Sequence, residues 1–323
     1  MAVYTHLGAE DMAALIAAYD VGTLVSAKGI AEGVSNSNWL VDTTGRDGAG
    51  TRFILTMYEF RIDLDDLPYF LSLLDHLAAR GCPVPRTIHD RDGALCRRIG
   101  DKAVALIEFL PGVSVSMPTL GQTHAVGVEL ARLHGAAADF PASRANTMAV
   151  AEWQRLGQAC GAEALATIDP WLARLVCEDL PRIAAAWPLD LPRGVIHADL
   201  FPDNVLVLGD AITGMIDFYF ACNDVTAYDL AITHLAWCWN DGDGTFRPDL
   251  SRALIDGYES VRPLSPAERA ALPLLAQGAA MRFMLSRAYD WLNTPKDALV
   301  TPKDPRPMGR RLQFYRDNPG IFA

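Results

Sequence analysis

Apolar and polar positions in the first hundred residues predict a small sheet with helices. Residues 9–20 combine early acidic residues with apolar residues at helical spacing, and residues 67–81 keep a helical period until Gly81, so each predicts a helix. A polar, glycine-rich segment between the first two predicted strands indicates a long hairpin. The predicted strands are 39–41, 52–60, 82–88, 94–100 and 102–110.

The pattern changes at Leu110-Pro111-Gly112, and from there to the end helices dominate. Residues 124–140 place Val126, Leu130 and Leu133 on one helical face. We expect three short strands in this part, two of them around 195–207 and one in 213–221. Residues 294–307 are rich in proline and predict an extended surface loop, and 310–319 predict a short last helix.

Length and charge limit the class of partner. The chain has 323 residues, half of them hydrophobic, which is enough for two domains or one two-lobed unit with a sizeable core. It carries 28 basic and 39 acidic residues, a net charge of -11, and this argues against nucleic acid or an anionic membrane as the main partner. We expect a small-molecule partner, and the sequence does not indicate an oligomeric state.

The cysteines and the N-terminus indicate a cytoplasmic location. The six cysteines form no C-x-x-C pair and have no histidines at zinc-ligand spacing, so they predict reduced, mostly buried thiols. The first 20 residues have no basic region, and no apolar run reaches the roughly 18 residues of a membrane span.

The segment VIHADLFPDNVLV, residues 195–207, sets polar residues between two apolar runs. It has the form H-x-D-x-x-x-x-N, from His197 to Asn204, and Asp217 follows thirteen residues later. Phosphoryl transfer needs a carboxylate that orients the attacking hydroxyl and oxygen ligands that hold magnesium against phosphates. Asp199, Asn204 and Asp217 supply such a set. The alternative is that Asp199 and Asn204 form turns and Asp217 caps a strand end, while His197 is expected to hold the loop through backbone hydrogen bonds.

A second polar segment, KGIAEGVSNSNWLV at 28–41, has small residues between two predicted strands. Its backbone N–H groups and hydroxyls are suited to phosphate, although it has no G-x-G-x-x-G pattern and a polar hairpin turn is the alternative.

Together these segments resemble the aminoglycoside phosphotransferase and choline kinase superfamily, with LIEFLPG at 106–112 similar to its hinge and VELARLHG at 128–135 similar to the helix before its catalytic loop. The resemblance implies an α+β, protein-kinase-like fold of two lobes, an antiparallel-sheet lobe at 1–108 that binds nucleotide and a mainly helical catalytic lobe at 109–323. It implies ATP and Mg²⁺ as cofactors, with Asp199 as the base and Asn204 and Asp217 as metal ligands. The residues it implies for nucleotide binding are Gly33, Val34, Ser35, Asn36, Ser37, Glu108, Phe109 and Leu110.

The sequence departs from this superfamily in two linked features. The third strand carries Thr56 where a lysine is expected, and the following helix has no glutamate to pair with one. Lys28 is the only lysine beside the nucleotide loop in the sequence. Lys28, Arg52, Arg61 or magnesium alone remain open as the group that neutralises the phosphates.

Further segments, FILTMYE and MRFMLSRAYDW among them, resemble bacterial homoserine kinases of this superfamily, which carry a threonine at the same strand position. This resemblance implies phosphorylation of the side-chain hydroxyl of L-homoserine, a step towards threonine. The alternatives are a related kinase of an amino alcohol, methylthioribose or an antibiotic, and a nucleotide-binding protein without activity. Asp229 is expected to brace the catalytic loop. The candidate substrate residues are Arg282, Arg287, Asp224 and His234.

Overall fold

The structure is a computed structural model that describes residues 7–30, 36–59, 63–240, 242–295 and 301–322. By its contacts the chain divides into two compact units. The N-terminal unit comprises Met1–Gly112 with Thr213–Tyr219, and the C-terminal unit comprises Val113–Ile212 with Phe220–Ala323. The predicted hinge segment thus ends where the first unit ends. The hydrophobic pattern did not predict that Thr213–Tyr219 belongs to the N-terminal unit.

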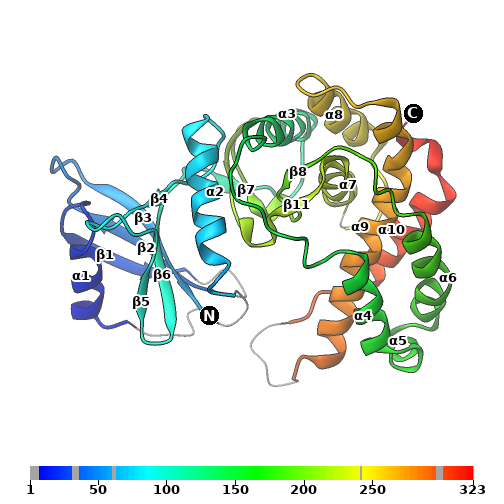
Figure 1. Ribbon diagram of the computed structural model, residues 1–323, viewed down its shortest axis with the longest axis horizontal. Coiled ribbons are helices and arrows are strands. Elements are labelled where there is room, and N and C mark those ends of the chain that lie inside the picture. The colour runs from blue at the N-terminus through cyan, green and yellow to red at the C-terminus, as the bar shows by residue number, and fades with distance from the viewer. Residues whose placement is uncertain (1–6, 31–35, 60–62, 241, 296–300, 323) are drawn as a thin grey trace. The chain divides into compact units, whose positions relative to one another are not determined.

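The N-terminal unit is an antiparallel sheet with two helices (Figure 1). Its strands follow the order β1-β2-β3-β6-β4, and β5 pairs with β6. All five pairings are antiparallel, in agreement with the sequence prediction. The elements are α1 (Ala9–Ala17), β1 (Leu24–Gly29), β2 (Asn36–Thr43), β3 (Thr51–Tyr58), α2 (Leu67–Ala79), β4 (Thr87–Ile88), β5 (Arg97–Ile99) and β6 (Lys102–Glu108).

Each face of this sheet buries one helix. Met12 and Ile16 of α1 pack with Leu55 of β3 in a cluster on one face. Leu67 and Leu71 of α2 pack with alanines of β6 in a cluster on the other face. Because side chains alternate along a strand, β3 contributes to both cores and is buried over most of its length.

The C-terminal unit is mainly helical, with short strands around the loop at residues 197–204 (Figure 1). β8 (Arg193–Ile196) pairs with β11 (Cys222–Val225), and β7 (Val113–Ser114) pairs with β9 (Val205–Leu208). β10 (Ala211–Met215) follows β9 and leads into the N-terminal unit. The helices are α3 (Leu120–Ala136), α4 (Val150–Cys160), α5 (Ala162–Ile168), α6 (Pro170–Ala186), α7 (Thr226–Trp237), α8 (Pro248–Glu259), α9 (Pro266–Asn293) and α10 (Arg306–Asp317).

Helix α7 is the centre of this unit. Every one of its residues is buried, and it packs against α3, α8 and α9. Helices α3 and α8 approach closely because Gly127 and Gly257 face the partner backbone. A Cβ at Gly127 would overlap the carbonyl oxygen of Leu254, and one at Gly257 would overlap that of His124. Glycine at these positions therefore sets the α3–α8 distance.

Three strands, β1, β7 and β11, were not predicted from the sequence. β1 was missed because nearly all of its side chains are exposed, which leaves no alternation to detect. β11 begins at Cys222, directly after the segment 213–221 that was predicted as one strand, whereas the structure ends β10 at Met215 and places a 3₁₀ turn at Phe218–Phe220. Within the described residues, no helix has the length and apolarity needed to cross a membrane.

Candidate active site

The catalytic loop segment, residues 197–204, connects β8 to β9 and has almost all of its polar backbone groups occupied. Ala198 has a φ of 64°, a left-handed conformation that is uncommon outside glycine and turns the chain between His197 and Asp199. The Asp199 carbonyl accepts a hydrogen bond from Phe201 N at 2.8 Å, and a 3₁₀ turn follows at Pro202–Asn204. Strained backbone of this kind persists only where neighbouring groups hold it.

Asn204 reaches back over this turn to Asp199. Its Nδ2 donates to the Asp199 carbonyl at 2.8 Å and lies 3.3 Å from Asp199 Oδ2. Its Oδ1 accepts no hydrogen bond from any residue that the structure describes. An oxygen that is fixed in place and not engaged is a suitable ligand for a hard cation such as Mg²⁺.

Asp229 holds the start of the loop from α7. Its carboxylate is buried and accepts hydrogen bonds from His197 N at 2.7 Å and Ala198 N at 2.8 Å. It also lies 3.0 Å from His134 Nε2. Burial alone raises the pKa of Asp229, but the hydrogen bonds and charges of His134 and His197 outweigh it and leave the pKa below its usual value. This is the bracing contact expected from the sequence.

Arg282 holds the same loop from α9. Its side chain is 1% exposed, and Nη1 donates to the Ala198 carbonyl at 2.6 Å. Its guanidinium group also lies 4.6 Å from the ring of Phe283. Arg282 was one of the candidate substrate residues named from the sequence. The structure instead buries it against the loop, because the carbonyl that the left-handed Ala198 turns inward needs a donor.

Two further side chains complete the hydrogen bonding of the loop. Asp199 N donates to His197 Nδ1 at 3.2 Å, the backbone role expected of this histidine. Trp237 of α7 is buried, and its indole N–H donates to the Leu200 carbonyl at 2.9 Å. The loop therefore has few alternative conformations, which pre-organises the Asp199 carboxylate.

Asp217 belongs to the N-terminal unit. It follows β10 and has a φ of 65°, the second non-glycine residue with positive φ among those described. Burial raises the pKa of Tyr58, and the negative charges of nearby groups, Asp217 among them, raise it further. Tyr58 lies two residues after Thr56 on β3, so its side chain points to the same face of the sheet. Asp217 therefore lies close to the face that carries the threonine.

The predicted nucleotide loop is described only at its end. Gly33, Val34 and Ser35 lie outside the described residues. Asn36 and Ser37 begin β2 and are buried, and the Ser37 hydroxyl donates to Glu59 Oε1 at 2.6 Å.

Glu59 reveals a lysine partner that the sequence did not indicate. Its side chain is fully buried directly after β3, and Lys102 at the start of β6 pairs with it. Lys28 is therefore not the only lysine near the nucleotide loop. The pair was missed because its members are 43 residues apart in the sequence and Glu59 precedes the helix in which a glutamate was sought.

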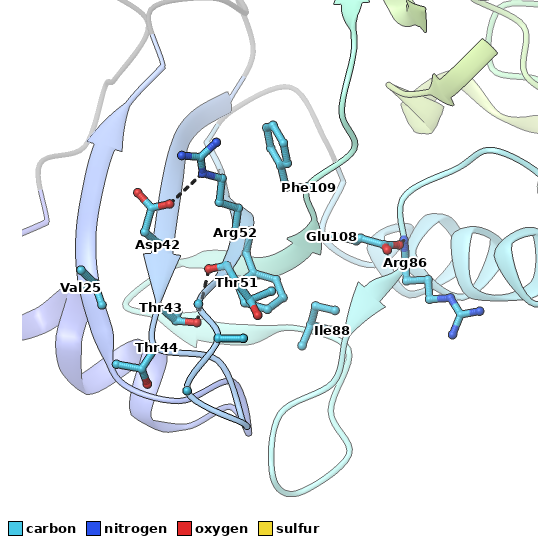
Figure 2. A pocket seen from close by; sticks show the side chains of 14 residues that line it. Val25, Asp42, Thr43, Thr44, Thr51, Arg52, Arg86, Ile88, Glu108 and Phe109 are labelled. Carbon is cyan, nitrogen blue, oxygen red and sulfur yellow. Dashed lines mark hydrogen bonds and ion pairs between the residues drawn. The ribbon is translucent and has the colours of Figure 1, made fainter. Parts of the chain in front are cut away.

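The other candidate cations differ in how they are engaged. Lys28 is exposed on β1 and lies in register with Leu40 and Ile54, so it shares the sheet face of Thr56. The Arg52 Nε is 2.9 Å from Asp42 Oδ1, and Figure 2 shows this ion pair at the edge of a cavity of about 910 Å³. Arg61 lies outside the described residues.

Two of the three predicted hinge residues, Glu108 and Phe109, line the cavity in Figure 2 together with residues of β1, β2 and β3. Glu108 N is engaged with the Arg86 carbonyl at 2.9 Å, and Glu108 Oε2 accepts from Arg86 N. Phe109 and Leu110 make no backbone hydrogen bond with any described residue. Asn36 and Ser37 are not among the residues that line this cavity.

The remaining substrate candidates lie apart from one another in the C-terminal unit. The Asp224 carboxylate is buried and bonded to Asn146 at 2.7 Å and to Arg193 at 3.1 Å. Both ring nitrogens of the buried His234 are engaged, with Tyr315 and Ser251 at 2.8 Å each. Arg287 lines a cavity that also contains residues of the catalytic loop segment.

Comparison with known proteins shows the family to which the chain belongs. Residues 26–264 match the phosphotransferase enzyme family. The chain is 51% identical to a homoserine kinase of Methylobacterium radiotolerans, over 98% of this chain and 96% of that protein. It is 50% identical to a homoserine kinase of Azorhizobium caulinodans, again over 98% and 96% of the two chains.

Solved structures show the same fold at low identity. An amicoumacin kinase in complex with AMP-PNP and Ca²⁺ has a TM-score of 0.70 at 16% identity, over 98% of this chain and 93% of that one. A spectinomycin phosphotransferase in complex with ADP and spectinomycin has a TM-score of 0.70 at 12% identity, over 98% and 97%. The prediction of an α+β, protein-kinase-like fold is therefore confirmed.

Proposed function

The chain belongs to the phosphotransferase enzyme family, and on this premise we propose that it transfers the γ-phosphoryl group of ATP to the side-chain hydroxyl of L-homoserine. The observation that carries the proposal is the identity of about half of all positions with homoserine kinases over nearly the full length of both chains. The product would serve a step towards threonine, and the cytoplasm is the compartment we propose for it.

In this proposal Asp199 orients the acceptor hydroxyl and accepts its proton. Asn204 donates a hydrogen bond to the Asp199 carbonyl, and Asp229 and Arg282 form hydrogen bonds with the backbone of Ala198. Together these bonds fix the position of the Asp199 carboxylate before substrate binds. Most of the catalysis in phosphoryl transfer comes from positioning and electrostatics. A rigid loop contributes the positioning, because it holds the base at the acceptor hydroxyl.

Mg²⁺ is the divalent cation we propose, with Asn204 Oδ1 and the Asp217 carboxylate as its protein ligands. The unengaged Oδ1 of Asn204 and the exposed, left-handed Asp217 fit this role. Bound ATP would supply the phosphoryl group, and Mg²⁺ would neutralise the charge that develops on that group during transfer. The hydrogen bond from Asn204 Nδ2 to Asp199 links the metal ligand to the base.

We propose that the lobe at 1–108 binds the nucleotide and that the lobe at 109–323 binds the acceptor and carries the catalytic residues. The loop of Gly33, Val34, Ser35, Asn36 and Ser37 would cover the phosphates, anchored at its end by the hydrogen bond of Ser37 to Glu59. The main-chain groups of Phe109 and Leu110, which make no hydrogen bond with any residue that the structure describes, are suited to the adenine edge next to Glu108.

The test is ADP release from the purified protein with MgATP and a panel of acceptors: L-homoserine, L-serine, choline, methylthioribose and kanamycin. We expect strong, saturable activity with L-homoserine alone. Preference for another acceptor would contradict the substrate and keep the reaction, and ATP binding without activity on any acceptor would contradict both. Asp199→Asn should lower kcat by orders of magnitude while ATP affinity is retained.

A further inference from the structure

A cavity in the C-terminal unit lies beside the catalytic loop segment. Its volume is about 700 Å³, which is within the range of about 300–1,000 Å³ that ligand sites occupy. Phe201, Pro202 and Asp203 form one part of its wall, directly before Asn204. The rest comes from the segment before α3, from the end of α7 through the start of α8, from Arg287 of α9, and from α10 with the residues just before it. A ligand in this cavity would therefore contact the loop that carries Asp199 and Asn204, through Phe201, Pro202 and Asp203.

Among the cations of this cavity, Arg310 has the freest guanidinium group. Arg311 donates to the Leu235 carbonyl at 2.8 Å, and Arg247 pairs with Asp249 at 2.6 Å, so both are engaged with the protein. Arg310 on α10 is exposed and makes no hydrogen bond or ion pair with any residue that the structure describes. Arg287 on α9 lines the same cavity. Guanidinium groups are suited to bidentate binding of a carboxylate.

The cavity also has an accessible negative charge. Asp203 faces it and is 3.6 Å from Lys303, and the side chains of this pair are 63% and 68% exposed. Such an exposed pair contributes little stability, so a ligand cation can compete for the carboxylate. Cationic and anionic groups on one cavity wall match a zwitterion better than an anion or a neutral alcohol.

We propose that this cavity binds the acceptor amino acid, with Arg310 and Arg287 holding its α-carboxylate and Asp203 its α-ammonium group. The inference rests on the proposed function and names the specificity residues of that reaction. Asp203 belongs to the same loop as Asp199 and Asn204 and directly precedes Asn204 in the chain, so an ammonium group held there would bind to the loop that carries the proposed base. The carboxylate site would explain how the enzyme selects an amino acid over an amino alcohol.

The test measures steady-state kinetics of Arg310→Met and Arg287→Met with L-homoserine and with 3-aminopropan-1-ol, which has the same hydroxyl and amine but no carboxylate. Loss of a charged bidentate contact should raise the KM for L-homoserine about 10- to 100-fold. We expect kcat and the KM for ATP to change less than about twofold, because the contact is made equally in the ground and transition states. Activity on 3-aminopropan-1-ol should be unchanged, and Arg310→Lys should restore part of the affinity.

The matched control is Arg174→Met, which removes an exposed arginine of α6 outside this cavity and should leave all constants unchanged. An unchanged KM for L-homoserine in both cavity variants would overturn the inference while the wild-type activity still supports the proposed function. Equal losses with L-homoserine and 3-aminopropan-1-ol would also overturn it, because the arginines would then not act on the carboxylate. A wild-type enzyme without activity on L-homoserine would instead refute the proposed function.

Discussion

Asn204 donates a hydrogen bond from Nδ2 to the main-chain oxygen of Asp199 at 2.8 Å. The same side chain can thus position the base and offer its Oδ1 to a metal. Asn204→Leu removes both contributions at similar volume, and we expect kcat to fall by about 100-fold or more, as for a misplaced reacting group. Steady-state assays at several Mg²⁺ concentrations measure the effect.

Two variants separate these contributions. Asn204→Asp keeps an oxygen ligand but places a second carboxylate beside Asp199, so kcat should stay low even at saturating Mg²⁺. Asn318→Leu is the control, because Asn318 also donates to a main-chain oxygen, that of Phe314 at 2.9 Å, but lies on the surface. Wild-type kcat in Asn204→Leu would contradict both assigned roles.

The glycine contact between α3 and α8 gives a prediction about stability. Gly127→Ala would force the Cβ into the Leu254 carbonyl, so the helices must separate, and we expect a loss of about 2 kcal/mol or more in the free energy of unfolding. Gly135→Ala is the matched control on the same helix, because a Cβ there meets no atom within 4 Å. It should stabilise the protein by about 0.5–1 kcal/mol. Urea unfolding of both variants checks the contrast.

The sequence predicted those parts of the site that are local in the chain. The loop around Asp199 and Asn204 was recognisable because its polar residues interrupt two apolar strands at a fixed spacing. The burial of Arg282 was not predicted. Helical periodicity indicates which residues share a face of the helix, but not whether that face contacts a buried carbonyl group. A buried arginine is rare, and its partner, the carbonyl of Ala198, depends on a backbone conformation that the sequence does not reveal.

The pair of Glu59 and Lys102 was missed for a different reason. Antiparallel pairing of β3 with β6 brings Tyr58 opposite Ala103 and so joins residues that are distant in the chain. Neither residue lies in a recognisable motif. Contacts between residues so distant in the chain depend on the register of the paired strands. Hydrophobic alternation can fix that register only once the strands and their order in the sheet are known.

The Lys102–Glu59 pair gives a prediction about both stability and nucleotide binding. Lys102→Met removes the cation that pairs with the buried Glu59 carboxylate, which should cost about 3–5 kcal/mol of unfolding free energy. Because Glu59 also accepts from Ser37, we expect a higher KM for ATP with a smaller change in kcat. Thermal unfolding and ATP kinetics measure the two effects.

A double variant tests whether the pair acts as a unit. Lys102→Met with Glu59→Gln removes both charges, so most of the lost stability should return, while Ser37 keeps an acceptor on residue 59. If the double variant is as unstable as the sum of the two single variants, the residues do not interact as the structure indicates.

His234 gives a prediction about pH. Burial lowers the pKa of its imidazole to about 3, whereas an unfolded chain binds the proton near 6.5. Between these values the unfolded state holds one more proton than the folded state, so stability must decrease as the pH falls from 6.5 towards 3. The slope from this residue is about 1.4 kcal/mol per pH unit.

His234→Gln removes this proton and keeps a side chain that can bond to Tyr315 or Ser251. Urea unfolding between pH 4.5 and 6.5 should therefore show a pH dependence that is weaker by about 1.4 kcal/mol per unit in the variant. The variant should also be less stable than the wild type at pH 7, where the imidazole is neutral and both of its hydrogen bonds are made. A pH dependence that does not change after the substitution would show that His234 is protonated in the folded protein, and its buried bonds with Tyr315 and Ser251 would then need another account.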